Sequence, residues 1–229
     1  GYTVPGVQKK LSLHLSKEEK ARLTLVGYPS GYILKPQTNE YRALPEAEQM
    51  IMCMADAAGI TTVPHGLIQS DGTYAYITKR VDRMVLPDQS IRLLAMEDFC
   101  QLTYRLTNDK YQSSYERCAK VIDRWSSQKG LDMAEFFIRI VFSFLVGNSD
   151  MHLKNFSLLE TAPGSQEFML SPAYDMLPVN IVSNDTEETA LALNGKKSNL
   201  RKKDFFALAA ACHLSLIHIS EPTRHLRIS

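Results

Sequence analysis

The sequence predicts an α+β fold of two lobes, a small strand-rich lobe followed by a mostly helical one. Three observations point to it. Short apolar alternations separated by glycine- and proline-containing turns fill residues 1–80, which is typical of strands. From Met96 onward, apolar residues recur with helical spacing. The apolar run from Phe136 to Val146, broken only by Arg139 and Ser143, then ends in a polar loop.

The first lobe is expected to be a sheet with one helix. Alternation predicts strands over Leu11–Leu15, Arg22–Val26, Tyr32–Lys35, Thr61–Ile68 and Tyr74–Thr78, and apolar spacing predicts a helix over Leu44–Gly59. Gly59 suits the helix C-terminus. Ser70-Asp-Gly72 indicates a hairpin between the last two strands.

The second lobe is expected to be built from helices and short strands. Helical spacing covers Met96–Leu106, Tyr115–Ser127, Leu131–Val146 and Lys203–Cys212, and strand patterns cover Asn155–Glu160, Glu167–Ser171 and Glu187–Asn194. Glu97 and Asp98 open the first of these helices, where acidic side chains complement the helix dipole.

Composition narrows the classes of function. The net charge of +1 gives no sign of a surface that binds nucleic acid directly. The four cysteines contain no C-x-x-C pair, so we expect free thiols without a disulfide framework or a zinc site. No secretory signal opens the chain, and the longest apolar run is shorter than the roughly 18 residues of a membrane span. We expect a cytoplasmic protein.

The polar loop Gly147–Asn155 carries the strongest chemical signal. Four residues separate Asp150 from Asn155, which is the spacing of a kinase catalytic loop. In such a loop the Asp orients an attacking hydroxyl and the Asn holds a metal ion. A second acid, Asp175, follows the predicted hairpin, where kinases place another metal ligand. The alternative is a polar turn that uses Asp and Asn for their turn chemistry.

Several stretches in this order resemble the kinase core of the HipA family of bacterial toxin-type serine/threonine protein kinases. They are Gly6-Val-Gln-Lys-Lys-Leu11, Tyr32-Ile-Leu-Lys-Pro36, Met96-Glu-Asp-Phe-Cys-Gln101, Lys110-Tyr111, Gly147-Asn-Ser-Asp-Met-His-Leu-Lys-Asn-Phe-Ser157 and Pro172-Ala-Tyr-Asp175. The resemblance covers residues 1–214 and implies a two-lobed protein-kinase-like fold, with an N-lobe over 1–83 and a helical C-lobe over 84–214.

The resemblance also implies a site for ATP and Mg²⁺. It makes Asp150 the catalytic base, with His152 and Lys154 beside it to neutralise the γ-phosphate, and Asn155 and Asp175 the metal ligands. Lys35 would grip the phosphates and pair with Glu48. The nucleotide-binding set comprises Thr3, Gly6, Val7, Gln8, Lys10, Lys35, Glu48, Lys79, Val81 and Asp82, in which 79–82 form the hinge that binds adenine. Thr3 stands where the family has an autophosphorylated serine.

The resemblance also leads to expectations about partners and about the two ends of the chain. Known family targets are aminoacyl-tRNA synthetases, and the usual partner is a HipB-like helix-turn-helix antitoxin. We expect an upstream segment to be missing, because the chain starts almost on the predicted phosphate-covering loop. HipA proteins usually carry an additional small N-terminal subdomain, and the related HipT proteins lack it. Residues 215–229 resemble a translated sequencing adapter and are expected to be non-native. A small-molecule or lipid kinase, suggested by the Asp-x-His arrangement, and a silent antitoxin-binding module remain the alternatives.

Overall fold

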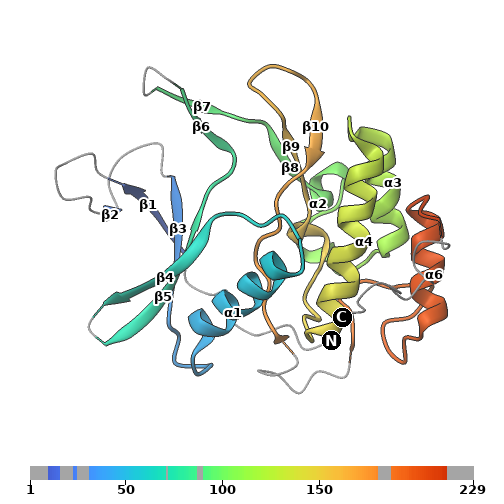
Figure 1. Cartoon of the computed structure of the whole chain (residues 1–229), viewed down its shortest axis with the longest axis horizontal. Coiled ribbons are helices and arrows are strands. Elements are labelled where there is room, and N and C mark those ends of the chain that lie inside the picture. Colours follow the sequence, from blue (N-terminus) through green and yellow to red (C-terminus); the bar gives the residue numbers. More distant parts are fainter. Residues whose placement is uncertain are drawn as a thin grey trace, which may run out of the picture.

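The chain folds as a small strand-rich lobe beside a mostly helical lobe (Figure 1). The computed structural model describes residues 10–15, 23–24, 31–70, 72–86, 90–179 and 187–215. In Figure 1 the strands of the first lobe lie on the left, and helices α3, α4 and α6 stand on the right. The two-lobed α+β fold expected from the sequence is confirmed.

A five-stranded antiparallel sheet forms the first lobe. Its order is β2 (Leu23–Thr24), β1 (Leu11–Leu15), β3 (Tyr32–Pro36), β5 (Thr73–Lys79) and β4 (His65–Ser70). Strands β4 and β5 form the expected hairpin, whose register pairs Ser70 with Thr73. Gly72 adopts a φ of 78°, a left-handed conformation that glycine tolerates without a Cβ clash. The central strand β3 carries Lys35 opposite Tyr76 of β5.

Helix α1 (Leu44–Ala57) packs on β4 and β5. Its buried face includes Glu48, Ile51, Met52 and Ala55, which recur at helical spacing, so a carboxylate points inward with the apolar side chains. At its C-terminus Gly59 has a φ of 81°, and the amide of Ile60 donates to the carbonyl of Ala55 at 3.0 Å. This is a Schellman cap, as the glycine predicted.

The second lobe combines helices with a three-stranded sheet. The helices are α2 (Phe99–Leu102), α3 (Tyr115–Trp125), α4 (Lys129–Leu145) and α6 (Lys202–Ala211), with short 3₁₀ turns at Thr107–Asp109 and Leu153–Asn155. The sheet order is β10 (Phe168–Leu170), β9 (Ser157–Glu160) and β8 (Met96–Asp98). A hairpin of β6 (Arg83–Val85) and β7 (Ile91–Leu93) projects between the lobes in Figure 1.

A buried arginine of the helical lobe links α4 to the segment after β10. Arg139 of α4 is 1% exposed, binds Glu135 one turn earlier, and donates to the carbonyl of Ser171 at 2.8 Å. Aromatic rings of Tyr115, Phe136 and Phe156 pack edge to face in the core of the same lobe. The arginine therefore joins α4 to the segment that leads to Asp175.

Two predicted elements are wrong. The helix expected over Met96–Leu106 is a strand, β8, followed by the single turn α2, because Met96–Asp98 pair with the free edge of β9. The strand expected over Glu187–Asn194 is absent from the described residues 187–194, where the backbone makes only isolated bridges, such as Ser114 with Ala192. The hairpin of β6 and β7 was not predicted. For these three segments, the presence or absence of a neighbouring strand determines whether a strand forms.

None of the helices in the described ranges is both long enough and apolar enough to cross a membrane. The four cysteines are free thiols, as expected, and only Cys53 is exposed.

Candidate active site

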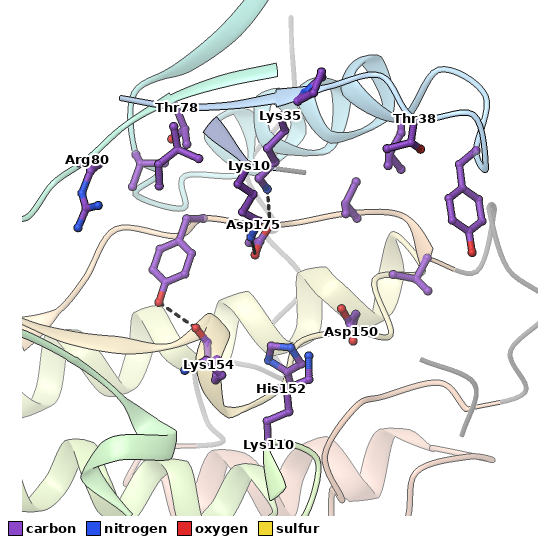
Figure 2. Close-up of a pocket in the computed structure, with 18 of the residues that line it drawn as sticks. Lys10, Lys35, Thr38, Thr78, Arg80, Lys110, Asp150, His152, Lys154 and Asp175 are labelled. Atoms are coloured by element: carbon purple, nitrogen blue, oxygen red, sulfur yellow. Dashed lines mark hydrogen bonds and ion pairs between the residues drawn. The ribbon is translucent and has the colours of Figure 1, made fainter. Parts of the chain in front are cut away.

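A cleft of 1090 Å³ is lined by residues of both lobes (Figure 2). Strands β3 and β5 and the segment after β5 supply one wall, and the polar loop with the segment before α3 supplies the other. Its described lining has more basic than acidic side chains: Lys10, Lys35, Lys79, Arg80, Lys110 and Lys154 against Glu40, Asp82, Asp150 and Asp175. The cleft therefore suits a polyanionic ligand of nucleotide size.

Lys35 is the centre of a buried ion-pair cluster. Its side chain is 3% exposed, and its ammonium donates to Glu48 at 2.5 Å and to Asp175. Asp175 also accepts from Lys10 at 3.2 Å. Burial alone would lower the pKa of Lys35, but the two carboxylates outweigh it and hold this pKa above its usual value. The lysine stays charged inside the lobe.

The two carboxylates of this cluster differ. Burial raises the pKa of Glu48 to about 7, against the opposing effect of Lys35. Burial would also raise the pKa of Asp175, but Lys35 and Lys10 hold it below its usual range. Asp175 has a φ of 61°, a left-handed conformation that is uncommon for a residue with a side chain. The strained backbone presents an ionised carboxylate to the cleft.

The polar loop after α4 is held by its own backbone. The amide of Asn148 donates to Ser143 at 2.8 Å, that of His152 to the carbonyl of Asp150 at 2.8 Å, and that of Asn155 to His152 at 3.0 Å. The carboxylate of Asp150 accepts from the hydroxyl of Tyr111 at 2.6 Å. Figure 2 shows Asp150 and His152 on the wall opposite Lys35, with Asp175 between them.

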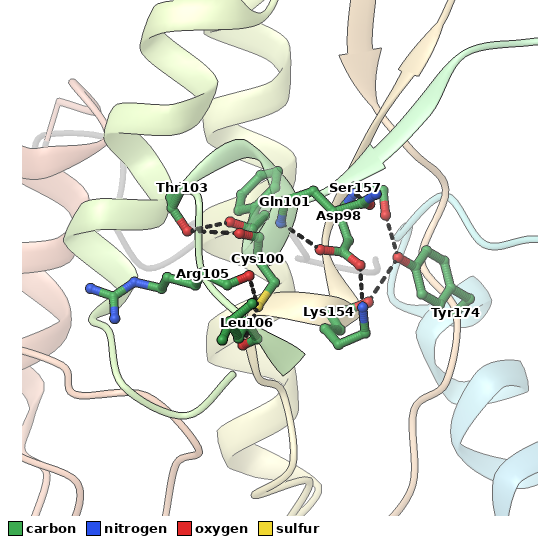
Figure 3. Close-up of polar contacts among 10 residues, drawn as sticks. Asp98, Cys100, Gln101, Thr103, Arg105, Leu106, Lys154, Ser157 and Tyr174 are labelled. Carbon is green, nitrogen blue, oxygen red and sulfur yellow. Dashed lines mark hydrogen bonds and ion pairs between the residues drawn. The ribbon is translucent and has the colours of Figure 1, made fainter. Parts of the chain in front are cut away.

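His152 and Lys154 behave differently within that loop. Burial lowers the pKa of His152, so the neutral imidazole is favoured. Lys154 is paired through its ammonium with Asp98 at 2.5 Å (Figure 3). The hydroxyl of Tyr174 donates to the carbonyl of Lys154 at 3.1 Å and bonds Ser157 at 2.6 Å. Of these two residues, only Lys154 offers the loop a positive charge.

Asn155 lies beside Asp175 and is 4% exposed. Its amide nitrogen donates to the backbone carbonyl of Asp175 at 3.2 Å, while its Oδ1 has no hydrogen-bond partner among the described residues. A buried amide oxygen without a donor is costly unless a ligand satisfies it. Oxygen ligands are those that Mg²⁺ prefers, and one carboxylate with substrate phosphates is a usual set. The residues fit a magnesium site.

The hinge predicted at residues 79–82 lies at the edge of the cleft, where Lys79, Val81 and Asp82 are lining residues. The carboxylate of Asp82 is not free for a ligand, because it accepts from Arg80 at 2.7 Å and from Arg83 at 2.7 Å. In the backbone of this segment, the amide of Lys79 donates to the carbonyl of Pro64 at 2.8 Å and that of Arg80 to the carbonyl of Gly31 at 2.8 Å.

The structure brings most of the predicted site residues to this cleft. Lys10, Lys35, Lys79, Val81, Asp82, Asp150, His152, Lys154 and Asp175 line it, with Glu48 and Asn155 directly behind Lys35 and Asp175. Thr3, Gly6, Val7 and Gln8 lie outside the described residues. No role in the site was predicted from the sequence for Tyr111, Asp98 or Tyr174. The only sequence signal for Tyr111 and Asp98 was that Lys110-Tyr111 and Met96–Gln101 resemble stretches of the family.

Comparison with known proteins gives a consistent result. Residues 2–227 match the family model of the HipA-like C-terminal domain. A protein named putative kinase Y4dM from Sinorhizobium fredii is 32% identical over 93% of this chain and 54% of its own length. The serine/threonine-protein kinase toxin HipA of Shewanella oneidensis is 24% identical over 84% of this chain and 46% of its own length.

A solved structure supports the fold. The Shewanella oneidensis HipA, solved with HipB and its operator DNA, superposes with a TM-score of 0.77 at 20% identity, over 93% of this chain and 53% of that one. The chain thus spans about half the length of the relatives that it matches. On the family match and the fold, this chain belongs to the family of the HipA-like C-terminal domain.

Proposed function

We propose that the chain transfers the γ-phosphoryl group of ATP to a serine or threonine hydroxyl of a protein. The observation that carries the proposal is the buried Lys35–Glu48 pair, which meets Asp175 across the cleft from Asp150. A charged lysine aimed by a buried glutamate and set against a carboxylate is the arrangement that grips nucleotide phosphates in kinases. The relatives named putative kinase and serine/threonine-protein kinase support the same reaction class.

Each residue has a chemical task in this proposal. Lys35 binds the phosphates, and Glu48 keeps its ammonium in place. Asp150 accepts the proton of the acceptor hydroxyl while the oxygen of that hydroxyl bonds to the γ-phosphorus and the bond to ADP breaks. Lys154 supplies positive charge beside the transferred group. Catalysis rests mainly on positioning and charge neutralisation.

Asn155 through Oδ1 and Asp175 through its carboxylate would hold Mg²⁺. Bound there, the ion supplies positive charge that offsets the developing charge on the phosphate oxygens. The described residues contain no group of three or more His, Cys, Asp or Glu side chains that could hold a metal alone. This agrees with a site completed by the phosphates of the substrate.

The acceptor and partner are the finer part of the proposal. We propose an aminoacyl-tRNA synthetase as the acceptor and a HipB-like helix-turn-helix protein as the partner. The solved HipA relative is in complex with HipB and operator DNA, which supports a partner of this kind. The net charge of +1 favours DNA contact through the partner rather than through this chain, and the reaction would take place in the cytoplasm.

The test is incubation with labelled ATP and a bacterial lysate, followed by identification of the labelled molecule. We expect label on serine or threonine of one protein. Asp150→Asn should lower transfer by about 10²–10⁴-fold, because the charge that accepts the proton is lost. ATP affinity and melting temperature should stay close to those of the parent, and the control Asp123→Asn, at an exposed carboxylate of α3, should transfer normally.

Other outcomes would replace the proposal. Label in a low-mass acceptor would indicate a small-molecule or lipid kinase. ATP binding without any transfer would indicate a regulatory module. Transfer by Asp150→Asn within about threefold of the parent would move the role of base to another residue, with His152 the first candidate.

A further inference from the structure

Tyr111 contacts the carboxylate that the proposed reaction needs as its base. Its hydroxyl donates to Oδ1 of Asp150 at 2.6 Å, across 39 positions of sequence. Tyr111 follows the 3₁₀ turn Thr107–Asp109, and both it and Asp150 line the cleft. A bond from a hydroxyl to a carboxylate is charge-assisted, and this class of hydrogen bond is about twice as strong as a neutral one.

Two further contacts fix the segment of Tyr111 relative to the loop, and a third restrains its ring. The amide of Leu153 donates to the carbonyl of Lys110 at 3.2 Å, which joins the two backbones. The rings of Tyr111 and His152 meet edge to face with centroids 5.0 Å apart. The ammonium of Lys110 lies 4.9 Å from the centre of the Tyr111 ring. The backbone hydrogen bond, the ring of His152 and the ammonium of Lys110 together restrain the ring of Tyr111. Its hydroxyl therefore approaches Asp150 from one direction.

This arrangement matters because a carboxylate is not fixed by its own backbone. The last side-chain torsion of an aspartate populates a broad, roughly two-fold range of angles. A hydrogen-bond donor to one carboxylate oxygen therefore selects the rotation of the carboxylate. A carboxylate oxygen that must accept a proton has to lie within about 2.6–3.2 Å of the hydroxyl. Misplacement of a reacting group by about 1 Å costs on the order of 10²-fold in rate.

We propose that Tyr111 is a positioning residue for Asp150, and that it holds Oδ1 so that Oδ2 receives the proton of the acceptor hydroxyl. The inference rests on the proposed function, since it assigns Tyr111 a task in the same transfer. Tyr111 itself touches neither nucleotide nor acceptor in this role. Its effect should therefore appear in kcat and not in the KM for ATP, whose phosphates are bound by Lys35 on the opposite wall.

The variant that isolates this role is Tyr111→Phe. It keeps the ring that packs on His152 and Lys110 and removes only the hydroxyl. The matched control is Tyr115→Phe, because the hydroxyl of Tyr115 also reaches the loop, where it donates to the backbone carbonyl of Met151 at 3.1 Å. Both variants lose one hydrogen bond to the same loop, and only the first loses one to the carboxylate.

We expect Tyr111→Phe to lower kcat by about 10- to 100-fold, the effect of one lost hydrogen bond to a charged group. The KM for ATP should stay within about twofold of the parent. Tyr115→Phe should lower the melting temperature while kcat stays within about twofold. In an Asp150→Asn background, adding Tyr111→Phe should cause no further loss beyond about twofold, because the two residues then act as one unit.

The contrary results are distinct. A kcat of Tyr111→Phe within about threefold of an active parent would overturn the inference and leave the proposed function intact. The same would follow if Tyr115→Phe lost as much kcat as Tyr111→Phe, or if the losses of Tyr111→Phe and Asp150→Asn multiplied, since both point to general loosening of the loop. A parent that binds ATP and transfers no phosphate would overturn the proposed function and the inference with it.

Discussion

At the scale of single residues, the notable feature is a lysine held by two carboxylates of different character. Lys35 and Glu48 are both buried, whereas the side chain of Asp175 keeps 30% of its exposure. Pairing offsets part of the cost of burying these two charges, and removal of one partner leaves an uncompensated charge. Glu48 is not one of the residues that line the cleft, but its carboxylate holds the ammonium of Lys35 in place.

The first prediction concerns the pH dependence of stability. The pKa of Glu48 is raised from 4.5 to about 7 in the folded state, so folded protein binds more protons than unfolded protein between those values. Stability from this group is present below the unfolded pKa and is lost as pH rises through the folded pKa. Urea unfolding at pH 5 and pH 8 should show that the parent loses stability relative to Glu48→Gln as pH rises.

The control for this prediction is Glu97→Gln, which removes the same charge from an exposed position of β8. Its stability difference from the parent should be nearly the same at the two pH values. If the difference between the parent and Glu48→Gln were also constant, or grew in favour of the parent toward pH 8, the assignment of a raised pKa to Glu48 would be wrong.

At the scale of elements, the side chain of Asp98 links the strand β8, the short helix α2 and the polar loop. Asp98 caps α2, where its Oδ1 accepts from the amide of Gln101 at 2.9 Å and the side chain of Gln101 accepts from the amide of Asp98. Its Oδ2 accepts from Lys154 at 2.5 Å (Figure 3). One carboxylate thus ends a strand, begins a helix and restrains a lysine of the candidate site.

The second prediction separates these two tasks of Asp98. Asp98→Asn keeps an oxygen for the cap and loses the charge, so its free energy of unfolding should fall by about 0–1 kcal/mol, the range for partly exposed ion pairs. Asp98→Ala also loses the cap and should cost about 1 kcal/mol more. Denaturant unfolding of the two variants measures the difference. Equal stabilities would show that the cap contributes little.

At the scale of the whole molecule, backbone contacts between the lobes set the position of Asp175. The amide of Val63 donates to the carbonyl of Ala173 at 3.0 Å, and the amide of Ala173 donates to that of Thr61 at 2.7 Å. These bonds attach the segment after β10 to the residues before β4, and Asp175, two residues further on, pairs with Lys35 of β3. The ion pairs of Asp175 with Lys35 and Lys10 then join the lobes across the cleft.

The third prediction concerns metal-dependent binding of nucleotide. If Asp175 and Asn155 hold Mg²⁺, calorimetry should show tighter ATP binding with Mg²⁺ than without it. Asp175→Asn should largely remove that difference, because a neutral amide is a weaker ligand for a hard cation. Asp150→Asn removes a charge from the same cleft without removing a proposed ligand, so it should keep the difference. Equal ATP affinity with and without Mg²⁺ in the parent would exclude this metal site.

The two-lobed fold and the order of its main elements could be predicted from the amino-acid sequence, because apolar spacing and glycine positions are local properties of the chain. The sequence also identified the loop of Asp150 and Asn155, whose spacing is local too. The pairing of Lys35 with Glu48 was an expectation from the family resemblance, whereas the contacts of Tyr111 with Asp150 and of Asp98 with Lys154 emerged from the folded chain alone. The same holds for Met96–Asp98, which became a strand through pairing with β9. The two side-chain contacts join residues 39 and 56 positions apart, and only folding brings such distant side chains and strands together.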